Sequence, residues 1–225
     1  MHQTKAAFLQ RARETLDDIY SDLQSLADIP LTSFSKKTTA LVVIDMVNGF
    51  VKSGPMSSGR VEKINVPIAA LTNACAQEGF KIVALCDSHT EQSPEFSAYP
   101  PHCLKGDEES EITDEIKASA PGRILRIDKA STNGFLEPAF QNFLSDNGDA
   151  DTFLLVGDCT DLCVLQFALA LKTDFNRRDK KCRVVVPAGL VETYELGAHN
   201  AELMNLFALY NLSINGIELV KEITF

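Results

Sequence analysis

TFLLVGDCTDLCVLQFALAL, residues 152–171, has the pattern around which the rest of the chain is organised. Phe153–Val156 is a short apolar run with a β-branched end, which is typical of a buried strand. Gly157 and Asp158 break this run, and a second apolar run, Leu162–Leu171, is long enough for a helix. A buried strand followed by a turn and a helix predicts one unit of an α/β fold with a mostly parallel sheet.

Cys163 lies in the first turn of the predicted helix. Thr160 or Asp161 can cap this helix, because either side chain can accept a hydrogen bond from the free amides of its first turn. These amides and the helix dipole favour an anion, so such positions lower the pKa of a cysteine and make it a nucleophile. A small cysteine buried in the core is the alternative interpretation.

The chain before and after this stretch alternates between apolar runs of strand length and helical patterns. The predicted strands are Thr39–Val47, Lys81–Cys86, Arg123–Ile127, Phe153–Val156, Arg183–Pro187 and Ile217–Ile223. The predicted helices of the body are Asn65–Gln77, Glu109–Ala120, Pro138–Leu144, Leu162–Leu171 and Glu195–Tyr210. Several strands are apolar on both faces, which predicts a three-layer, doubly wound α/β fold with a mostly parallel six-stranded sheet.

Residues 4–28 have the pattern of an amphipathic helix, because their apolar side chains recur at steps of three and four. These side chains are Leu9, Ala12, Leu16, Ile19, Leu23 and Leu26. We assign residues 1–35 to this helix and its linker, and residues 36–225 to a single α/β domain. The apolar stripe has to be covered by the body or by a neighbouring subunit, so we expect a homo-oligomer.

Composition excludes several classes of partner. The 225 residues carry a net charge of −10, from 21 basic and 31 acidic side chains, which argues against nucleic acid and anionic membranes. Met1–Arg13 is polar and lacks the apolar core of a signal peptide, and no run is long enough to span a membrane. The six cysteines are therefore interpreted as reduced thiols of a cytoplasmic protein.

Ligands of such sheets bind beyond the carboxyl ends of the strands, where this sequence places reactive side chains. Asp45 interrupts an apolar strand, and burying a carboxylate is costly unless it is paired. Lys129 is the expected partner, either in a structural salt bridge or in a cluster with Cys163. In such a cluster Lys129 stabilises the thiolate and the carboxylate, while Asp45 takes the thiol proton and later hands it to a leaving amine.

Two histidines and two acids form a second group near the same edge. Asp87 and His89 lie at i and i+2 after a strand, on one side of the sheet. His102 follows a loop with three prolines, and Glu95 lies within that loop. These residue types suit Zn²⁺, Fe²⁺ or Mn²⁺, and ligand type alone does not choose among them. Surface histidines in a polar loop are the alternative.

Five segments resemble a known family. VVIDMVNGF, DSHT, PPHCLKG, RIDKASTNGF and VGDCTDLCV occur in the order found in the isochorismatase-like cysteine hydrolases, and most resemble the nicotinamidase/pyrazinamidase branch. The similarity covers about residues 39–191. It implies a catalytic triad of Asp45, Lys129 and Cys163 in an amidohydrolase that forms a thioester. It also implies a cis peptide bond between Asp158 and Cys159, with the amides of Cys159 and Cys163 as the oxyanion hole.

The resemblance also implies a bound metal ion. In nicotinamidases the residues matching Asp87, His89 and His102 bind a divalent ion that holds the ring nitrogen of the substrate. Glu95 resembles a fourth ligand, a carboxylate, that many members use. The resemblance therefore implies one divalent ion per chain, with Zn²⁺ as the first choice and Mn²⁺ or Fe²⁺ as alternatives.

The same resemblance implies which residues contact the substrate. Phe50 and Tyr99 match positions where nicotinamidases place aromatic rings against the flat substrate. Two positions depart from the pattern: Val47 stands where a Gln is usual, and Asp158 where a small apolar or neutral residue is usual. The predicted reaction is hydrolysis of nicotinamide to nicotinate and ammonia. The alternatives are the same chemistry on an N-carbamoyl, ureido or other small amide, and a catalytically silent assembly module.

Overall fold

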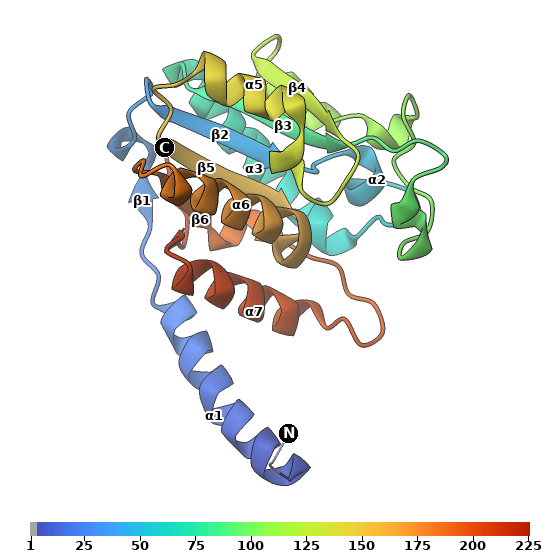
Figure 1. Cartoon of the computed structure of the whole chain (residues 1–225), viewed down its shortest axis with the longest axis vertical. Coiled ribbons are helices and arrows are strands. Elements are labelled where there is room, and N and C mark those ends of the chain that lie inside the picture. Colours follow the sequence, from blue (N-terminus) through green and yellow to red (C-terminus); the bar gives the residue numbers. More distant parts are fainter. Residues whose placement is uncertain (1–3) are drawn as a thin grey trace.

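A parallel β-sheet forms the centre of the protein (Figure 1), which is described here over residues 4–225 of a computed structural model. Its strand order is β4-β3-β2-β5-β6-β8, and a short strand, β7, pairs with the end of β5. The bounds are β2 Thr39–Ile44, β3 Lys81–Asp87, β4 Ile124–Lys129, β5 Thr152–Asp158, β6 Arg183–Pro187, β7 Val191–Glu192 and β8 Glu218–Val220. Every pairing is parallel, so the predicted six-stranded parallel sheet is confirmed.

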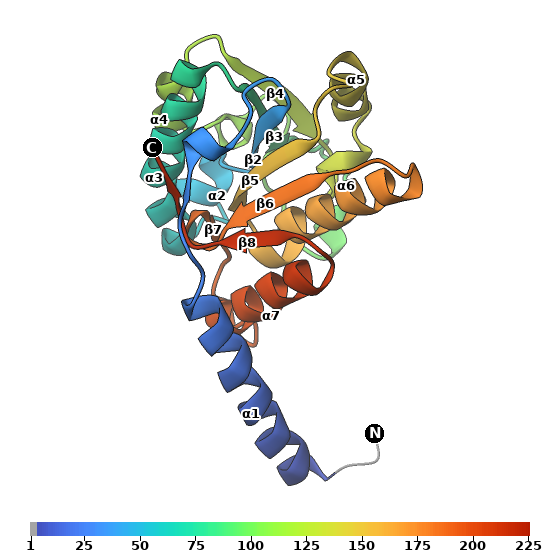
Figure 2. The ribbon, with the colours of Figure 1, turned by 90° about the vertical axis from the view of Figure 1, so that its left-hand side faces the viewer.

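Helices cover both faces of the sheet (Figure 2). The helix α3 lies on one face, and α5, α6 and α7 lie on the other. The helix bounds are α1 Lys5–Gln24, α2 Asn48–Val51, α3 Gly59–Glu78, α4 Asp114–Ser119, α5 Pro138–Asp146, α6 Leu165–Arg177 and α7 Ala201–Ile214. Among the described residues, no helix is both long and apolar enough to cross a membrane.

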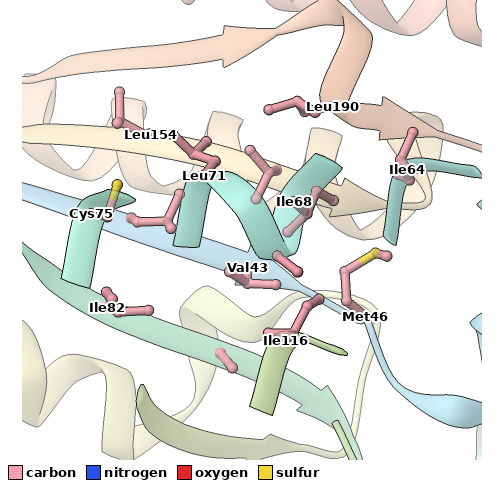
Figure 3. Packing of buried hydrophobic residues seen from close by; sticks show 14 of the residues in the cluster. Val43, Met46, Ile64, Ile68, Leu71, Cys75, Ile82, Ile116, Leu154 and Leu190 are labelled. Carbon is pink, nitrogen blue, oxygen red and sulfur yellow. The ribbon is translucent and has the colours of Figure 1, made fainter. Parts of the chain in front are cut away.

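The strands are apolar on both faces because each side of the sheet has its own core. Along β2, Leu41 and Val43 pack on the α3 side, whereas Val42 and Ile44 pack on the α6 side. Figure 3 shows the first of these cores, where side chains of α3 such as Ile68 lie against the strands. The sheet is therefore held from both faces, and its carboxyl edge is a rigid base for a site.

Two predicted strands differ from the structure by more than two residues. Thr39–Val47 was predicted as one strand, but β2 ends at Ile44 because Asp45 adopts a left-handed conformation with φ 55°. The predicted strand Ile217–Ile223 is two strands, β8 and β9 (Ile223–Thr224). The second of these pairs with β1 (Ile29–Pro30) and leaves the main sheet.

Three predicted helices begin five or six residues away from their predicted first residue. The helix α3 begins at Gly59 and not at Asn65, and it continues through Pro67. Pro67 and Lys63 are both exposed, so water can bind the carbonyl that the proline leaves free. The predicted helix Glu195–Tyr210 begins only at Ala201, and the predicted Glu109–Ala120 shortens to α4.

The helix after β5 begins in a way that the sequence did not predict. Thr160–Val164 forms a π-helical turn, and α6 continues from Leu165. Neither Thr160 nor Asp161 caps the turn in the described structure, because Asp161 accepts hydrogen bonds from Thr193 and pairs with His199 instead. The predicted cap is therefore wrong, although Cys163 does lie in the first turn.

The N-terminal helix is confirmed as α1, capped by Thr4, whose side chain accepts from the amide of Ala7. Its C-terminal half lies beside α7, and its N-terminal half extends away from the body (Figures 1 and 2). Of the predicted stripe only Ile19 is fully buried, while Leu9 remains 52% exposed.

Candidate active site

The carboxyl edge of the sheet brings three charged side chains together. Asp87 ends β3, Lys129 ends β4, and Asp45 follows the last residue of β2. The left-handed backbone of Asp45 turns its carboxylate along the edge, where Oδ1 accepts the amide N–H of Asp87 at 3.0 Å. All three side chains are buried.

Lys129 is at the centre of this group. Its Nζ lies 2.9 Å from Asp45 Oδ2 and 2.5 Å from Asp87 Oδ1. The same nitrogen lies 3.7 Å from Cys163 Sγ and donates to the carbonyl of Ser131 at 3.1 Å. Lys129 thus joins two carboxylates and the thiol, and β3 lies between its own strand and that of Asp45.

The turn after β5 places Cys163 beside this ammonium. Gly157 has a φ of 120°, and a Cβ there would lie 2.0 Å from the carbonyl oxygen of Ile44, so only glycine allows β5 to approach β2. The peptide bond between Asp158 and Cys159 is cis, as the family resemblance implied.

Charge and burial act in opposite directions on the three charged groups. Burial alone would lower the pKa of Lys129, but Asp45 and Asp87 raise it well above its usual value. Burial alone would raise the pKa of Asp87, but Lys129 and the two histidines lower it. For Asp45 burial outweighs the attraction of Lys129 and raises the pKa to about 6. Above that pH the site holds two carboxylates and one ammonium.

The thiol of Cys163 differs from the prediction. Its pKa is raised, because full burial disfavours the thiolate more than Lys129 stabilises it. The expected resting thiolate at a helix start is therefore wrong. A protonated thiol needs a base, and the ionised Asp45 is within the same buried group.

Asp87, His89 and His102 form a buried group that could bind a metal ion. One ligand atom from each lies within 4.8 Å of the others. Asp87 Oδ2 lies 3.2 Å from Nε2 of His89 and 3.3 Å from Nε2 of His102. Ligands about 2.1 Å from a small divalent ion lie about 3.0–3.4 Å apart in octahedral or tetrahedral shells, so these separations fit.

Hydrogen bonding at the far side of each ring supports the same assignment. Nδ1 of His102 lies 2.8 Å from the carbonyl of Pro100, which can only accept, so this nitrogen carries the proton. Nδ1 of His89 lies 3.3 Å from Ser93 Oγ. Nε2 of His89 is buried and has no hydrogen-bond partner among residues 4–225. A buried imidazole nitrogen that faces a carboxylate oxygen without a hydrogen bond is what a cation would satisfy.

Glu95 lies at the margin of this group. Its Oε2 is 3.7 Å from Nε2 of His89, and its Oε1 accepts the amide N–H of Thr132 at 2.9 Å. The carboxylate therefore faces the histidine but is not among the ligand atoms that lie within 4.8 Å of one another.

A small cavity joins the two groups. Asp45, Cys159 and Cys163 line it from the strand ends. Its other walls include Asp87, Glu95 and His102, together with the rings of Phe50 and Tyr99. The rings of these two aromatics lie 5.5 and 6.3 Å from His102. The cavity volume is about 20 Å³, room for about one water molecule, so a substrate enters only when lining side chains move.

Sequence reasoning missed some lining residues. Met56, Thr132 and Leu162 also face the cavity, and ordinary residues of this kind carry no sequence signal. Asp158, noted only as a departure, lines the cavity as well, and its Oδ1 is buried without a hydrogen-bond partner in the described chain. The sequence signal that could have identified Asp158 is its position as a charged residue at the end of a buried strand.

His199 also has a role that its sequence context did not reveal. Its Nε2 lies 2.8 Å from Asp161 Oδ2, and Thr193 donates to the other oxygen of Asp161 at 2.7 Å. The ring of Tyr194 stacks on His199 with 4.0 Å between centroids. These contacts fasten the loop before α7 to the π-helical turn that carries Cys163.

Comparison with known proteins places this geometry in context. The sequence profile of the isochorismatase domain family matches residues 39–214. Nicotinamidase 1 of Arabidopsis thaliana is 29% identical over 228 aligned positions, covering 87% of this chain and 91% of that protein.

Solved structures share the fold. N-carbamoylsarcosine amidase from Thermoplasma acidophilum has a TM-score of 0.66 and 28% identity, covering 82% of this chain and 96% of its own. The pyrazinamidase of Pyrococcus horikoshii, solved in complex with zinc, has a TM-score of 0.69 and 23% identity, covering 84% and 99%.

Proposed function

We propose a function within the isochorismatase family, to which this chain belongs: it hydrolyses a small primary amide, nicotinamide first, through a thioester on Cys163. The observation that carries the proposal is the position of Lys129 Nζ, 2.9 Å from Asp45 and 3.7 Å from the sulfur of Cys163, beside one buried cavity. A nucleophile, a base and a fixed cation in reach of one another are the parts that amide cleavage requires.

The first step is proton transfer from Cys163 to Asp45. With its pKa raised to about 6, Asp45 is ionised at neutral pH and is still a far better base than a free carboxylate. Lys129 stabilises the thiolate as it forms. The thiol thus loses its proton as it attacks the carbonyl carbon of the amide.

Backbone amides around the cis peptide would stabilise the negative charge that develops on the substrate. We propose that the amide N–H groups of Cys159 and Cys163 donate to the carbonyl oxygen as it becomes an oxyanion. When the tetrahedral intermediate collapses, the C–N bond breaks and Asp45 returns the proton to the leaving nitrogen, which departs as ammonia. A water molecule then attacks the thioester, Asp45 takes its proton, and the acid leaves as the thiol reforms.

A flat substrate would be held on the loop side of the cavity. Asp87, His89 and His102 would hold a divalent ion, Zn²⁺ before Mn²⁺ or Fe²⁺, with Glu95 as a further carboxylate. Such an ion supplies a Lewis-acidic binding point for a ring nitrogen. Phe50 and Tyr99 would pack on the ring, which converts binding into orientation of the carboxamide over Cys163.

Ammonia release from nicotinamide tests the proposal. The wild type should release ammonia, and Cys163→Ala should not. Cys182→Ala is the matched control, because this buried thiol precedes β6 at the opposite edge of the sheet and should leave the rate unchanged. Mass spectrometry of quenched reactions should find the acyl group on Cys163 alone. Equal rates for wild type and Cys163→Ala would refute the thioester route.

Asp158 favours a second candidate substrate. Its carboxyl lines the cavity with Oδ1 unpartnered among the described residues, where a ureido or carbamoyl N–H could donate to it. Val47, at the position of a usual Gln, and the 28% identity to N-carbamoylsarcosine amidase point the same way. A panel of nicotinamide and N-carbamoyl amino acids decides. Turnover confined to the carbamoyl compounds and lost in Asp158→Leu would select this second candidate, and no turnover of any amide would select a silent module.

A further inference from the structure

The helix α1 presents an uncovered apolar face beside α7. Leu9 and Tyr20 are 52% and 57% exposed, and Phe8 is 53% exposed. On α7, Phe207 and Tyr210 are 47% and 41% exposed. Large apolar side chains exposed on two neighbouring helices are typical of an interaction surface.

The two helices enclose an open groove. Its two adjoining hollows, of about 900 and 450 Å³, share Leu16 and Tyr20 of α1 and Leu206 of α7. Leu9 extends the groove along the N-terminal half of α1. Figure 2 shows that this half of the helix leaves the body. The groove therefore has the length and apolar lining to receive another helix.

Four side chains of α1 that line this groove form two pairs that are symmetric about the middle of the helix. The helix Lys5–Gln24 has its midpoint between Glu14 and Thr15. Leu9 and Tyr20 are equidistant from this midpoint. So are Arg13 and Leu16, which also line the groove. A second α1 that runs antiparallel about a two-fold axis at the midpoint would therefore meet each residue with its counterpart.

Charge along α1 favours the same direction. The N-terminal half carries three basic residues, Lys5, Arg11 and Arg13, and one acidic residue, Glu14, next to the midpoint. The charged residues of the C-terminal half are all acidic: Asp17, Asp18 and Asp22. Antiparallel helices set the basic half of one against the acidic half of the other, whereas parallel helices would oppose like charges. A second copy of this chain is thus the complementary partner.

We propose that α1 is a dimerisation helix, through which two copies of this chain pair antiparallel about a two-fold axis at the middle of α1, in the groove beside α7. Each Leu9 then lies against Tyr20 of the other copy, and Arg13, which lines the groove, lies near Asp17 of the other copy. The active-site cavity is formed by the carboxyl edge of the sheet and takes no residue from α1, so pairing is separate from the chemistry.

Light scattering tests the pairing. The wild type should have a mass of about 49 kDa, twice the chain mass of 24.7 kDa. Leu9→Asp should reduce it to that of one chain. Ala7→Asp is the matched control, since it adds the same charge two residues away on the opposite side of α1 and should stay paired. A wild type of single-chain mass, or a Leu9→Asp variant that remains paired, would overturn the proposal.

Cross-linking tests the direction. All six native cysteines are buried, so new surface thiols can be followed alone. A mixture of Leu9→Cys and Tyr20→Cys chains should form a disulfide-linked dimer on oxidation. Neither variant alone should do so, because identical positions lie about 16 Å apart along antiparallel helices at 1.5 Å per residue, beyond the reach of a disulfide. Linking by Leu9→Cys alone would show a parallel pair and refute the two-fold arrangement.

Discussion

Replacing Lys129 by Met should destabilise the fold and remove activity. The substitution keeps an unbranched side chain of similar length and removes the ammonium from between two carboxylates. At separations of 2.9 and 2.5 Å, each attraction is worth about 6 kcal/mol at an effective dielectric constant of 20. Burying the ammonium offsets much of this gain, and loss of one partner of a buried pair costs about 3–5 kcal/mol.

Chemical denaturation measures this loss. The free energy of unfolding of Lys129→Met should fall by about 3–5 kcal/mol with an unchanged m-value. Both proteins are treated with a chelator, so that no bound cation replaces the ammonium. The variant should release no ammonia, because the thiolate loses its cation.

A compensated variant separates charge from packing. Adding Asp45→Asn and Asp87→Asn to Lys129→Met removes the two carboxylates that are left unpaired. Most of the lost stability should then return, while activity stays absent. An unchanged midpoint for the single variant, or no recovery in the triple variant, would refute the view that Lys129 acts as the counter-charge of this site.

Three further outcomes are expected. With Asp45 as base and its pKa raised to about 6, kcat/KM should fall about tenfold per pH unit below that value and level off above it; a profile flat down to pH 4 would contradict this role. His89→Ala should lose the metal measured by elemental analysis after exposure to zinc, whereas His199→Ala, outside the ligand group, should keep it. Benzamide, which lacks the ring nitrogen, should react far more slowly than nicotinamide, and equal rates would remove the metal group from substrate binding.

Much of the fold could be predicted because burial leaves a direct trace in the sequence. The strand Arg183–Pro187 has the predicted bounds, since three consecutive valines are buried between a charged residue and a proline. The rule that parallel strands present their carboxyl ends at one edge also placed Asp45, Lys129 and Cys163 together. These predictions needed only local pattern and topology.

The remaining features depend on contacts between distant segments. The helix α7 begins six residues late because the loop before it is tied to Asp161 through His199. The last strand divides because Lys221 donates its amide to Ala27, and Glu222 accepts from Ile29, in the segment after α1. The raised pKa of Cys163 likewise depends on complete burial, which its place in the first turn of a helix did not reveal.

Asp87 belongs to both chemical groups of the site, and this shared membership has a thermodynamic consequence. Its Oδ1 binds Lys129 and its Oδ2 faces the two histidines. A cation at the histidines would draw on the same carboxylate that helps to hold the ammonium beside Cys163. Linkage is reciprocal: the factor by which a cation changes the proton affinity of the thiol equals the factor by which that proton changes the affinity for the cation. We therefore expect alkylation of Cys163 with a neutral or an anionic reagent to shift the Kd for the metal, although the modified sulfur lies outside the group that would bind the metal.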